Sequence, residues 1–182
     1  MKKKILVSLL MLVTMRIFAQ NNMVTISGGY SSANIEDVDA RATGWRLNGL
    51  YEFKTQSSKV AQGLSIGYMS IAATSSSADG KITSTINSIP IYYAPKYLFG
   101  KDKFKGFVKG ALGMQFASLK REGALSVSSN DFGFYGGAGA GIMLFISEKI
   151  FVNGEYEIAW ASNSWYRDGW ISSAMGGIGV RF

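Results

Sequence analysis

The chain has 182 residues, with 19 lysines and arginines, 12 aspartates and glutamates, no histidine and no cysteine. The lack of histidine excludes Ser-His-Asp and Cys-His catalysis and removes the commonest ligand of transition metals. The lack of cysteine excludes disulfides and a lipid-anchored lipoprotein. We therefore predict a protein that is not an enzyme and that has no catalytic, cofactor-binding or metal-binding residues.

The first segment has the features of a cleaved export signal. Residues 2–4 are all lysine, residues 5–15 form a mainly apolar core, and Ala19 suits a cleavage site. The apolar run is too short to cross a bilayer as a helix, which takes about 20 residues. We predict a signal peptide over residues 1–19, with the exact bond left open, and one domain over residues 20–182.

Most of the positive charge of the chain belongs to that signal. Four of the 19 basic residues precede Ala19, so residues 20–182 hold 15 basic and 12 acidic residues, a net charge of +3. They contain no cluster of lysine and arginine and no recognition helix, and we expect no nucleic-acid partner.

From Val24 onward, short segments alternate apolar and polar residues, and clusters of Ser, Gly, Asn and Asp separate them. Eight strands are predicted: Met23–Ser31, Gly44–Phe53, Val60–Ala73, Thr85–Leu98, Gly106–Phe116, Phe132–Phe145, Ile150–Trp160 and Trp170–Phe182. Most are near the roughly nine to eleven residues that a tilted strand needs to cross a bilayer. Pro90 and Pro95 remove two ladder donors, so we expect a local irregularity in the fourth strand.

The connections between these strands alternate in length. The short ones are Lys54–Lys59, Phe99–Lys105 and Ile146–Lys149, and the longer ones are Ser32–Thr43, Thr74–Ser84, Ala117–Asp131 and Ala161–Gly169. Outer-membrane barrels show this asymmetry, with tight periplasmic turns and longer external loops. We predict an all-β fold, an eight-stranded antiparallel up-and-down transmembrane β-barrel with both termini in the periplasm.

The second predicted strand shows the two faces most clearly. Trp45, Leu47 and Tyr51 alternate with Arg46, Asn48 and Glu52. In a membrane barrel the apolar face meets lipid and the polar face lines the lumen. A soluble sandwich has the same alternation with the apolar face inward, so the pattern alone does not separate the two.

Aromatic residues gather at both ends of the predicted strands. Trp45, Trp160 and Trp170 lie at the end with the longer loops, and Tyr51, Phe53, Tyr97, Phe99, Phe107, Phe145, Phe151 and Phe182 lie next to the short turns. Two aromatic girdles at the membrane interfaces would produce this distribution.

Charged and amide residues fall on the predicted interior face: Arg46, Asn48, Glu52, Lys96, Lys109, Gln115, Asn153, Glu155, Glu157 and Arg181. The interior of an eight-stranded barrel is only wide enough for side chains, so these charges must pair. We predict a lower cluster in which Glu52 and Glu155 neutralise Lys96 and Lys109, and an upper pair between Arg46 and Glu157. A gated pore plugged by this network is the functional alternative. Glu155 and Glu157 could also suggest a glycosidase pair, but no open cleft surrounds them.

The last predicted strand places Ala174, Ile178, Val180 and Phe182 on one apolar face. It resembles the final strand of Gram-negative outer-membrane barrels, which carries the assembly signal. The segments SIPIYY (88–93), GFVKGALGMQF (106–116), FYGGAGAGIML (134–144) and GGIGVRF (176–182) add to this likeness. Residues 20–182 resemble a small porin-family outer-membrane barrel of the OmpA and OmpX type.

The resemblance implies a place in the bacterial outer membrane after export. It also implies contact with outer-membrane lipid and lipopolysaccharide, and insertion by the barrel-assembly machinery. Some eight-stranded barrels are lipid A deacylases or acyltransferases, but those enzymes rely on a histidine that this chain lacks.

We predict a structural or surface-interaction role in which external loops meet an extracellular ligand. The candidate contact residues are Glu36, Asp37, Asp39, Arg41, Lys120, Arg121, Glu122, Trp165, Tyr166 and Arg167. A narrow channel for ions or very small solutes is the first alternative. A soluble periplasmic lipocalin-like binder is the second.

Overall fold

The computed structural model describes residues 21–182 except 37–40, 55–57, 78–79, 102 and 123–126. The predicted signal peptide therefore lies outside the described residues. The strands are β1 (Asn21–Ile35), β2 (Arg41–Lys54), β3 (Val60–Ser77), β4 (Gly80–Tyr93), β5 (Lys96–Lys101), β6 (Phe104–Glu122), β7 (Val127–Phe145), β8 (Ile150–Ala161) and β9 (Tyr166–Arg181). Among the described residues, no helix is long and apolar enough to cross a membrane.

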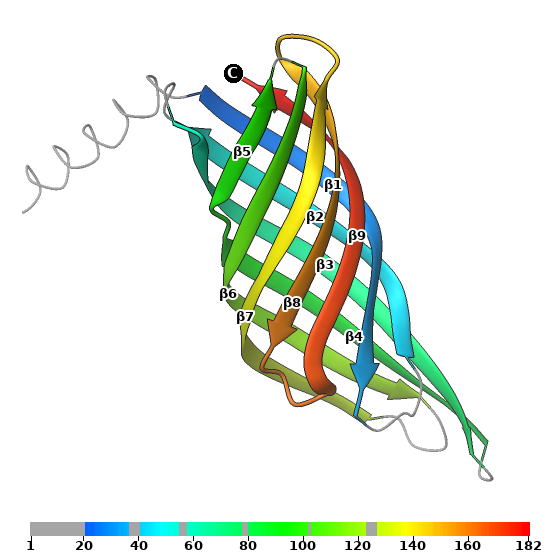
Figure 1. The fold of residues 1–182 in the computed structure, drawn as a ribbon. Helices are drawn as coiled ribbons and strands as arrows, with labels where there is room; N and C mark the ends of the chain where they lie inside the picture. The colour runs from blue at the N-terminus through cyan, green and yellow to red at the C-terminus, as the bar shows by residue number, and fades with distance from the viewer. Residues whose placement is uncertain (1–20, 37–40, 55–57, 78–79, 102, 123–126) are drawn as a thin grey trace, which may run out of the picture.

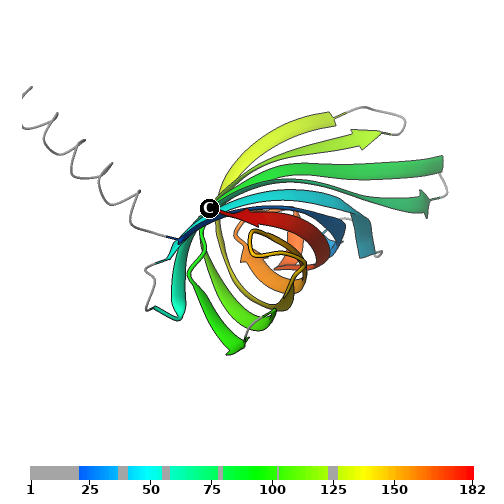
Figure 2. The same ribbon diagram turned by 90° about the horizontal axis from the view of Figure 1, so that it is seen from above.

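These segments close into one antiparallel barrel (Figures 1 and 2). Apart from β4 and β5, consecutive strands pair with each other, and β1 closes the ring by pairing with β9. Strands β4 and β5 lie end to end and share β3 and β6 as partners, so the nine segments make eight barrel strands. The predicted fold class is confirmed.

The break between β4 and β5 falls at Pro95, where an irregularity was expected. The register is unchanged across the break. Tyr93 pairs with Leu112, and Lys96, three residues after Tyr93, pairs with Lys109, three residues before Leu112. Each proline of this strand faces a glycine on a neighbouring strand. A Cβ at Gly67 would lie 3.3 Å from Pro90, and one at Gly110 would lie 3.3 Å from Pro95. The prolines therefore interrupt the hydrogen-bond ladder without a bulge, because small partners make room for their rings.

Two of the longer connections, Thr74–Ser84 and Ala117–Asp131, were wrongly predicted as loops over most of their described residues. Strands β3 and β4 run to Ser77 and from Gly80, and β6 and β7 run to Glu122 and from Val127. Figures 1 and 2 show these two hairpins projecting beyond the rest of the barrel. Their Ser and Thr residues were taken as loop composition, but threonine also favours strands. Thr74 and Thr83 face each other across the hairpin, with their hydroxyls 3.3 Å apart.

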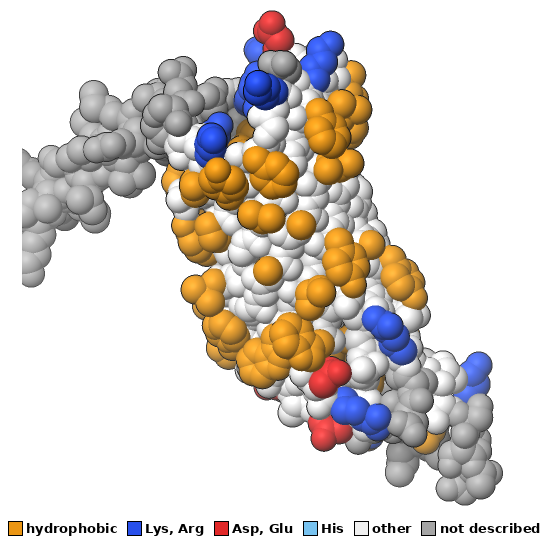
Figure 3. Space-filling view, viewed as in Figure 1, with side chains coloured by type: hydrophobic (Ala, Val, Ile, Leu, Met, Phe, Trp, Pro, Cys, Tyr) orange, Lys and Arg blue, Asp and Glu red, His pale blue; other side chains and the backbone are white. Residues whose placement is uncertain are grey.

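The wall is apolar outside, as a membrane barrel requires. Along β2, Arg46, Asn48 and Glu52 are buried in the lumen, whereas Trp45 and Leu47 are half exposed on the outer face. Figure 3 shows hydrophobic side chains spread over the wall and charged side chains at its two ends. A lipocalin-like binder would need the opposite arrangement, with its apolar face inward.

The lumen itself has three layers. Its ends hold two apolar clusters, and the buried charged residues lie between them. The cluster toward the projecting hairpins includes Ile35, Met69, Ile71, Ala73, Ile86, Leu119, Tyr166 and Ile171. The cluster at the short turns comprises Met23, Ala61, Leu98, Phe107, Met143, Phe145 and Phe151.

Three members of the second cluster were assigned to the wrong face. Phe107, Phe145 and Phe151 were predicted in an aromatic girdle, but all three are buried in the lumen. Phe107 stands two residues from the lumen-facing Lys109, and side chains two apart share a face. The wrong prediction followed from the aromatic residue type, whereas the alternation of side chains places Phe107 in the lumen.

Candidate functional site: a sealed and charged lumen

The guanidinium of Arg46 is the centre of the charged layer. Its Nη1 donates to Glu157 Oε1 at 2.7 Å, to Tyr135 Oη at 3.0 Å and to Ser173 Oγ at 3.1 Å. Its Nη2 donates to Tyr92 Oη at 3.2 Å. Strands β2, β4, β7, β8 and β9 each contribute one of these residues, so the group ties five strands together.

The carboxylate of Glu157 receives contacts from three further directions. The Tyr135 hydroxyl donates to Oε1 at 2.6 Å, and the Tyr92 hydroxyl donates to Oε2 at 3.3 Å. Lys109 Nζ lies 2.8 Å from the same Oε2. Glu157 has no exposed surface, and this set of donors offsets the cost of burying its charge.

Lys109 joins the two levels that were predicted to be separate. Its ammonium lies 2.7 Å from Glu155 Oε1 and 2.8 Å from Glu157 Oε2. The expected Lys109–Glu155 and Arg46–Glu157 contacts are both present, and Lys109 makes them one network. The two glutamates are therefore held by cations and are not free to act as an acid and base pair.

The remaining pair stands apart from this network. Lys96 Nζ lies 2.8 Å from Glu52 Oε1, and 4.6 Å from the ring centroid of Phe107. The contact with Glu52 brings opposite charges together but lacks hydrogen-bond geometry, and both carboxylate oxygens of Glu52 are without a hydrogen bond. Glu52 is thus the least well supported of the buried charges.

The other predicted interior residues divide into two groups. Asn48 and Gln115 are buried in the lumen; Asn48 accepts from Ser65 at 3.0 Å, and Gln115 donates to Asn163 at 3.1 Å. Asn153 is partly buried. Arg181 was wrongly placed in the ion network, because it lies at the short-turn end and donates to the Glu148 carbonyl at 2.5 Å.

The layer is electrically balanced. The buried charged residues among those described are Arg46, Lys96, Lys109, Glu52, Glu155 and Glu157, three cations and three carboxylates. The hydroxyls of Tyr92, Tyr135 and Ser173 were not predicted to take part. In the sequence, only the alternation of side chains along their strands indicates that these three residues face the lumen. No group of residues in the described part of the chain could hold a metal ion.

Both ends of the lumen are closed by apolar side chains. Toward the hairpins, Tyr166 is buried, so it is not the surface contact that was predicted, and the partly buried Trp165 packs against the same cluster. Tyr166 also lies within 3.3 Å of Gln115 Nε2. At the short turns, Phe107, Phe151 and Met143 fill the cross-section, and the hollow beyond them has a volume of only about 30 Å³.

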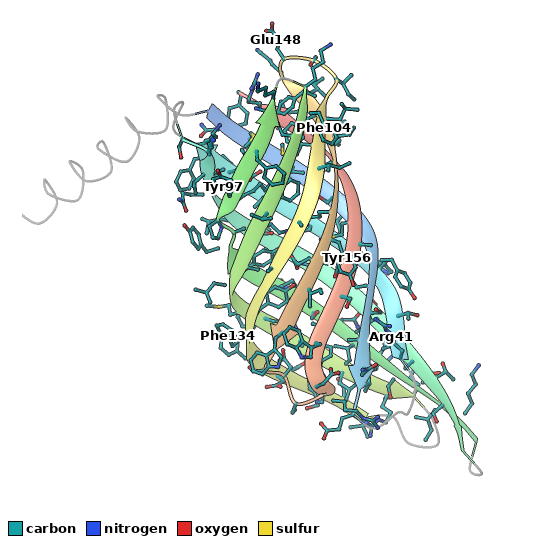
Figure 4. The ribbon with its side chains drawn as sticks, viewed as in Figure 1. Arg41, Tyr97, Phe104, Phe134, Glu148 and Tyr156 are labelled. Carbon is teal, nitrogen blue, oxygen red and sulfur yellow. The ribbon has the colours of Figure 1, made fainter. Side chains whose placement is uncertain are left out.

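Apart from Phe107, Phe145 and Phe151, the predicted girdle residues lie on the outer wall. Trp45, Trp160, Trp170, Tyr51 and Tyr97 are exposed to the surroundings, and Phe53 is partly exposed. Figure 4 shows Tyr97 and Phe104 near the short turns, Phe134 near the opposite end, and Tyr156 about midway. The aromatic residues therefore favour the ends of the wall without being confined to them.

The predicted assembly signal occupies the outer face of β9. Ala174, Ile178 and Val180 are exposed there, as is Phe182, which follows the strand. Phe182 N donates to Asn22 O at 2.9 Å and Asn22 N donates to Phe182 O at 3.0 Å, so the ladder with β1 continues through Phe182.

The predicted contact residues on the hairpins are only partly described. Glu36, Arg41, Lys120, Glu122 and Arg167 are exposed, Arg121 is partly exposed, and Asp37 and Asp39 lie outside the described residues. Lys120 Nζ and Glu122 Oε1 are 2.6 Å apart at the exposed end of β6. Their hydrogen bond raises the pKa of Lys120 and lowers the pKa of Glu122.

The closed wall, its apolar outer face and its charged lumen are those of an outer-membrane barrel, and the sequence agrees. The family described as "Outer membrane protein beta-barrel domain" matches residues 5–182. The chain belongs to this family. No curated protein matches it.

Several solved outer-membrane barrels share the fold. Neisserial surface protein A is 12% identical with a TM-score of 0.67, over 88% of this chain and 97% of that one. Ail, the attachment invasion locus protein of Yersinia pestis, is 19% identical with a TM-score of 0.54, over 88% and 99%. The N-terminal β-barrel domain of Pseudomonas aeruginosa OprF is 14% identical with a TM-score of 0.54, over 90% and 98%.

Proposed function

We propose that this outer-membrane barrel neither conducts nor catalyses, and that it serves as a rigid anchor for surface hairpins. The observation that carries the proposal is the sealed lumen. A conducting path would have to displace the apolar side chains at both ends and also separate the buried ion pairs between them. Separating a buried pair costs about 3–5 kcal/mol.

The hairpins supply the surface for interaction. Strands β3, β4, β6 and β7 continue as a four-stranded sheet beyond the barrel, and this sheet has two edges. No described residue pairs with Ala73–Ser77 on the β2 side, or with the backbone of Val127–Asn130 on the β8 side. Unpaired strand edges accept an extended segment of another protein, with main-chain hydrogen bonds providing the affinity.

Basic residues at the hairpin end of the barrel suggest a first probe. Arg41, Lys81, Lys120, Arg121 and Arg167 lie at this end of the barrel. The structure of Ail has been solved in complex with a heparin analogue, sucrose octasulfate, and Ail shares the present fold. We propose immobilised heparin as the first extracellular ligand to test on whole cells, with cells lacking the gene for this chain as the control.

Conductance in a planar bilayer tests the central proposal. Protein folded into the bilayer, shown by its altered migration on an unheated SDS gel, is expected to give no discrete openings. Reproducible openings whose ion selectivity changes in Lys109→Gln would favour the channel instead. Export by residues 1–19 is tested separately by the N-terminal sequence of the protein recovered from the outer membrane.

A further inference from the structure

Positive charge gathers at the short-turn end of the barrel, opposite the hairpins. The described residues there include Lys54, Lys59, Lys101, Lys103, Lys105, Lys149 and Arg181. Glu148 is the one acidic residue among the described residues of the short connections, and Asp102 lies outside them. Figure 3 shows the blue side chains at this end, with the red of an acidic one beyond them.

Three of these cations face the mouth of the lumen together. Lys54, Lys105 and Arg181 line the hollow of about 30 Å³, whose other walls are Met23, Leu98, Met143 and Phe145. Lys105 Nζ lies 5.0 Å and Arg181 Cζ lies 5.2 Å from the ring centroid of Phe145. Each cation is partly buried. Strands β2, β6 and β9 bring them together from distant parts of the sequence.

These cations lack the carboxylates that neutralise the charged layer above them. None of the ion pairs formed by described residues includes Lys54, Lys105 or Arg181. Arg181 uses one nitrogen on the Glu148 carbonyl and keeps further N–H donors. Like charges held close together are destabilising until an anion joins them.

We propose that the short-turn mouth of the barrel is a binding site for a phosphate group, held by Lys54, Lys105 and Arg181. Phosphate suits the site because it offers several acceptor oxygens and at least one negative charge to three converging cations. The hollow has room for about one water-sized group. One phosphate oxygen therefore enters it, while the rest of the group lies over the rim.

The first experiment titrates inorganic phosphate into ¹⁵N-labelled protein folded in lauryldimethylamine oxide micelles at 0.15 M salt. Saturable shifts are expected at the amides of Lys105, Phe145 and Arg181. Arg181→Gln and Lys105→Gln each remove a charged hydrogen bond and should weaken binding about tenfold. Lys59→Gln removes the same charge outside the hollow, and should change the affinity less than about twofold, because salt screens exposed charges.

The proposal is overturned if no saturable shift occurs, or if Lys59→Gln weakens binding as much as Arg181→Gln. An unheated SDS gel shows whether each variant is folded. A second experiment identifies the source of the phosphate by comparing nanodiscs of phosphatidylglycerol with nanodiscs of a galactolipid that has no phosphate. If lipid headgroups fill the site, added phosphate shifts the amides only in the galactolipid discs. If the site takes dissolved phosphate, the shifts are equal in both.

Discussion

The middle and the ends of the lumen solve the same packing problem in different ways. The middle is filled by Arg46, Lys109 and Glu157, and the carboxylate of Glu157 contacts the two cations at 2.7 and 2.8 Å. The ends are filled by side chains such as Ile71 and Phe151, which have no exposed surface. Burying a charge is costly unless its partners are in place, whereas an apolar side chain needs only complementary shape. Removing one charge from the middle should therefore cost most of the unfolding free energy that its network contributes. At the ends, the loss of unfolding free energy should grow with the side-chain volume removed.

The largest effect is expected from Arg46→Met. It leaves the Tyr92 and Tyr135 hydroxyls and one side of Glu157 without their cation, and should lower the free energy of unfolding by about 3–5 kcal/mol. Urea unfolding in lipid vesicles, followed by tryptophan fluorescence, measures this loss. Lys120→Met is the control, because its pair with Glu122 is fully exposed and should contribute little. A wild-type midpoint for Arg46→Met would contradict the central role of this residue.

A double-mutant cycle then isolates the pair itself. Arg46→Met, Glu157→Gln and their combination should show a coupling energy of about 1–3 kcal/mol, since the residues share one network. Additive effects would mean that Lys109 alone satisfies Glu157.

At the short-turn end, the expected loss of unfolding free energy is slightly smaller than for Arg46→Met. Phe151→Ala removes a fully buried ring and should cost about 3 kcal/mol, the lower end of the range for this change. Bilayer conductance should stay at zero, because the ion-paired layer still blocks the lumen. Openings in Phe151→Ala would show that the apolar end alone makes the seal.

Alternation of residues along strands allowed much of this arrangement to be predicted from the sequence. Arg46 and Glu157 were predicted to form an upper pair in the lumen, and the structure pairs them at 2.7 Å. Tyr92 and Tyr135 were missed because their place beside Arg46 depends on the register of strands distant in sequence. Phe107 was misplaced because aromatic character outweighed alternation. The Ser- and Thr-rich hairpins were misread because composition does not separate a loop from a polar strand.

A charge introduced on the outer face should lower the free energy of unfolding, because it lacks the partners that the charges in the lumen have. Ile178→Arg places a cation on the lipid-facing side of β9, between Ile26 and Val152, where it has no carboxylate partner. The expected loss of unfolding free energy is about 1–2 kcal/mol, between the values for the interface and the midplane, because Ile178 lies three residues before the end of β9 at Arg181. Ile178→Val is the matched control and should change little. If Ile178→Arg unfolds like Ile178→Val, the outer face does not contact lipid at this height.

The smallest effect is expected where the two ways of filling the lumen meet, at Lys96 and Glu52. Glu52 makes no hydrogen bond, and Lys96 already lies over the Phe107 ring of the neighbouring apolar cluster. Replacing a buried pair by apolar or neutral groups of similar volume is often neutral, although removing one partner is not. Lys96→Met combined with Glu52→Gln should therefore lie within about 1 kcal/mol of the wild type, while each single change is clearly destabilising. The same urea titration measures all three variants.

A double variant as unstable as its singles would show that this pair is needed as much as the Arg46 network. A double variant with nearly wild-type unfolding free energy would show that apolar and neutral side chains can replace this pair, which lacks the hydrogen bonds of the Arg46 network.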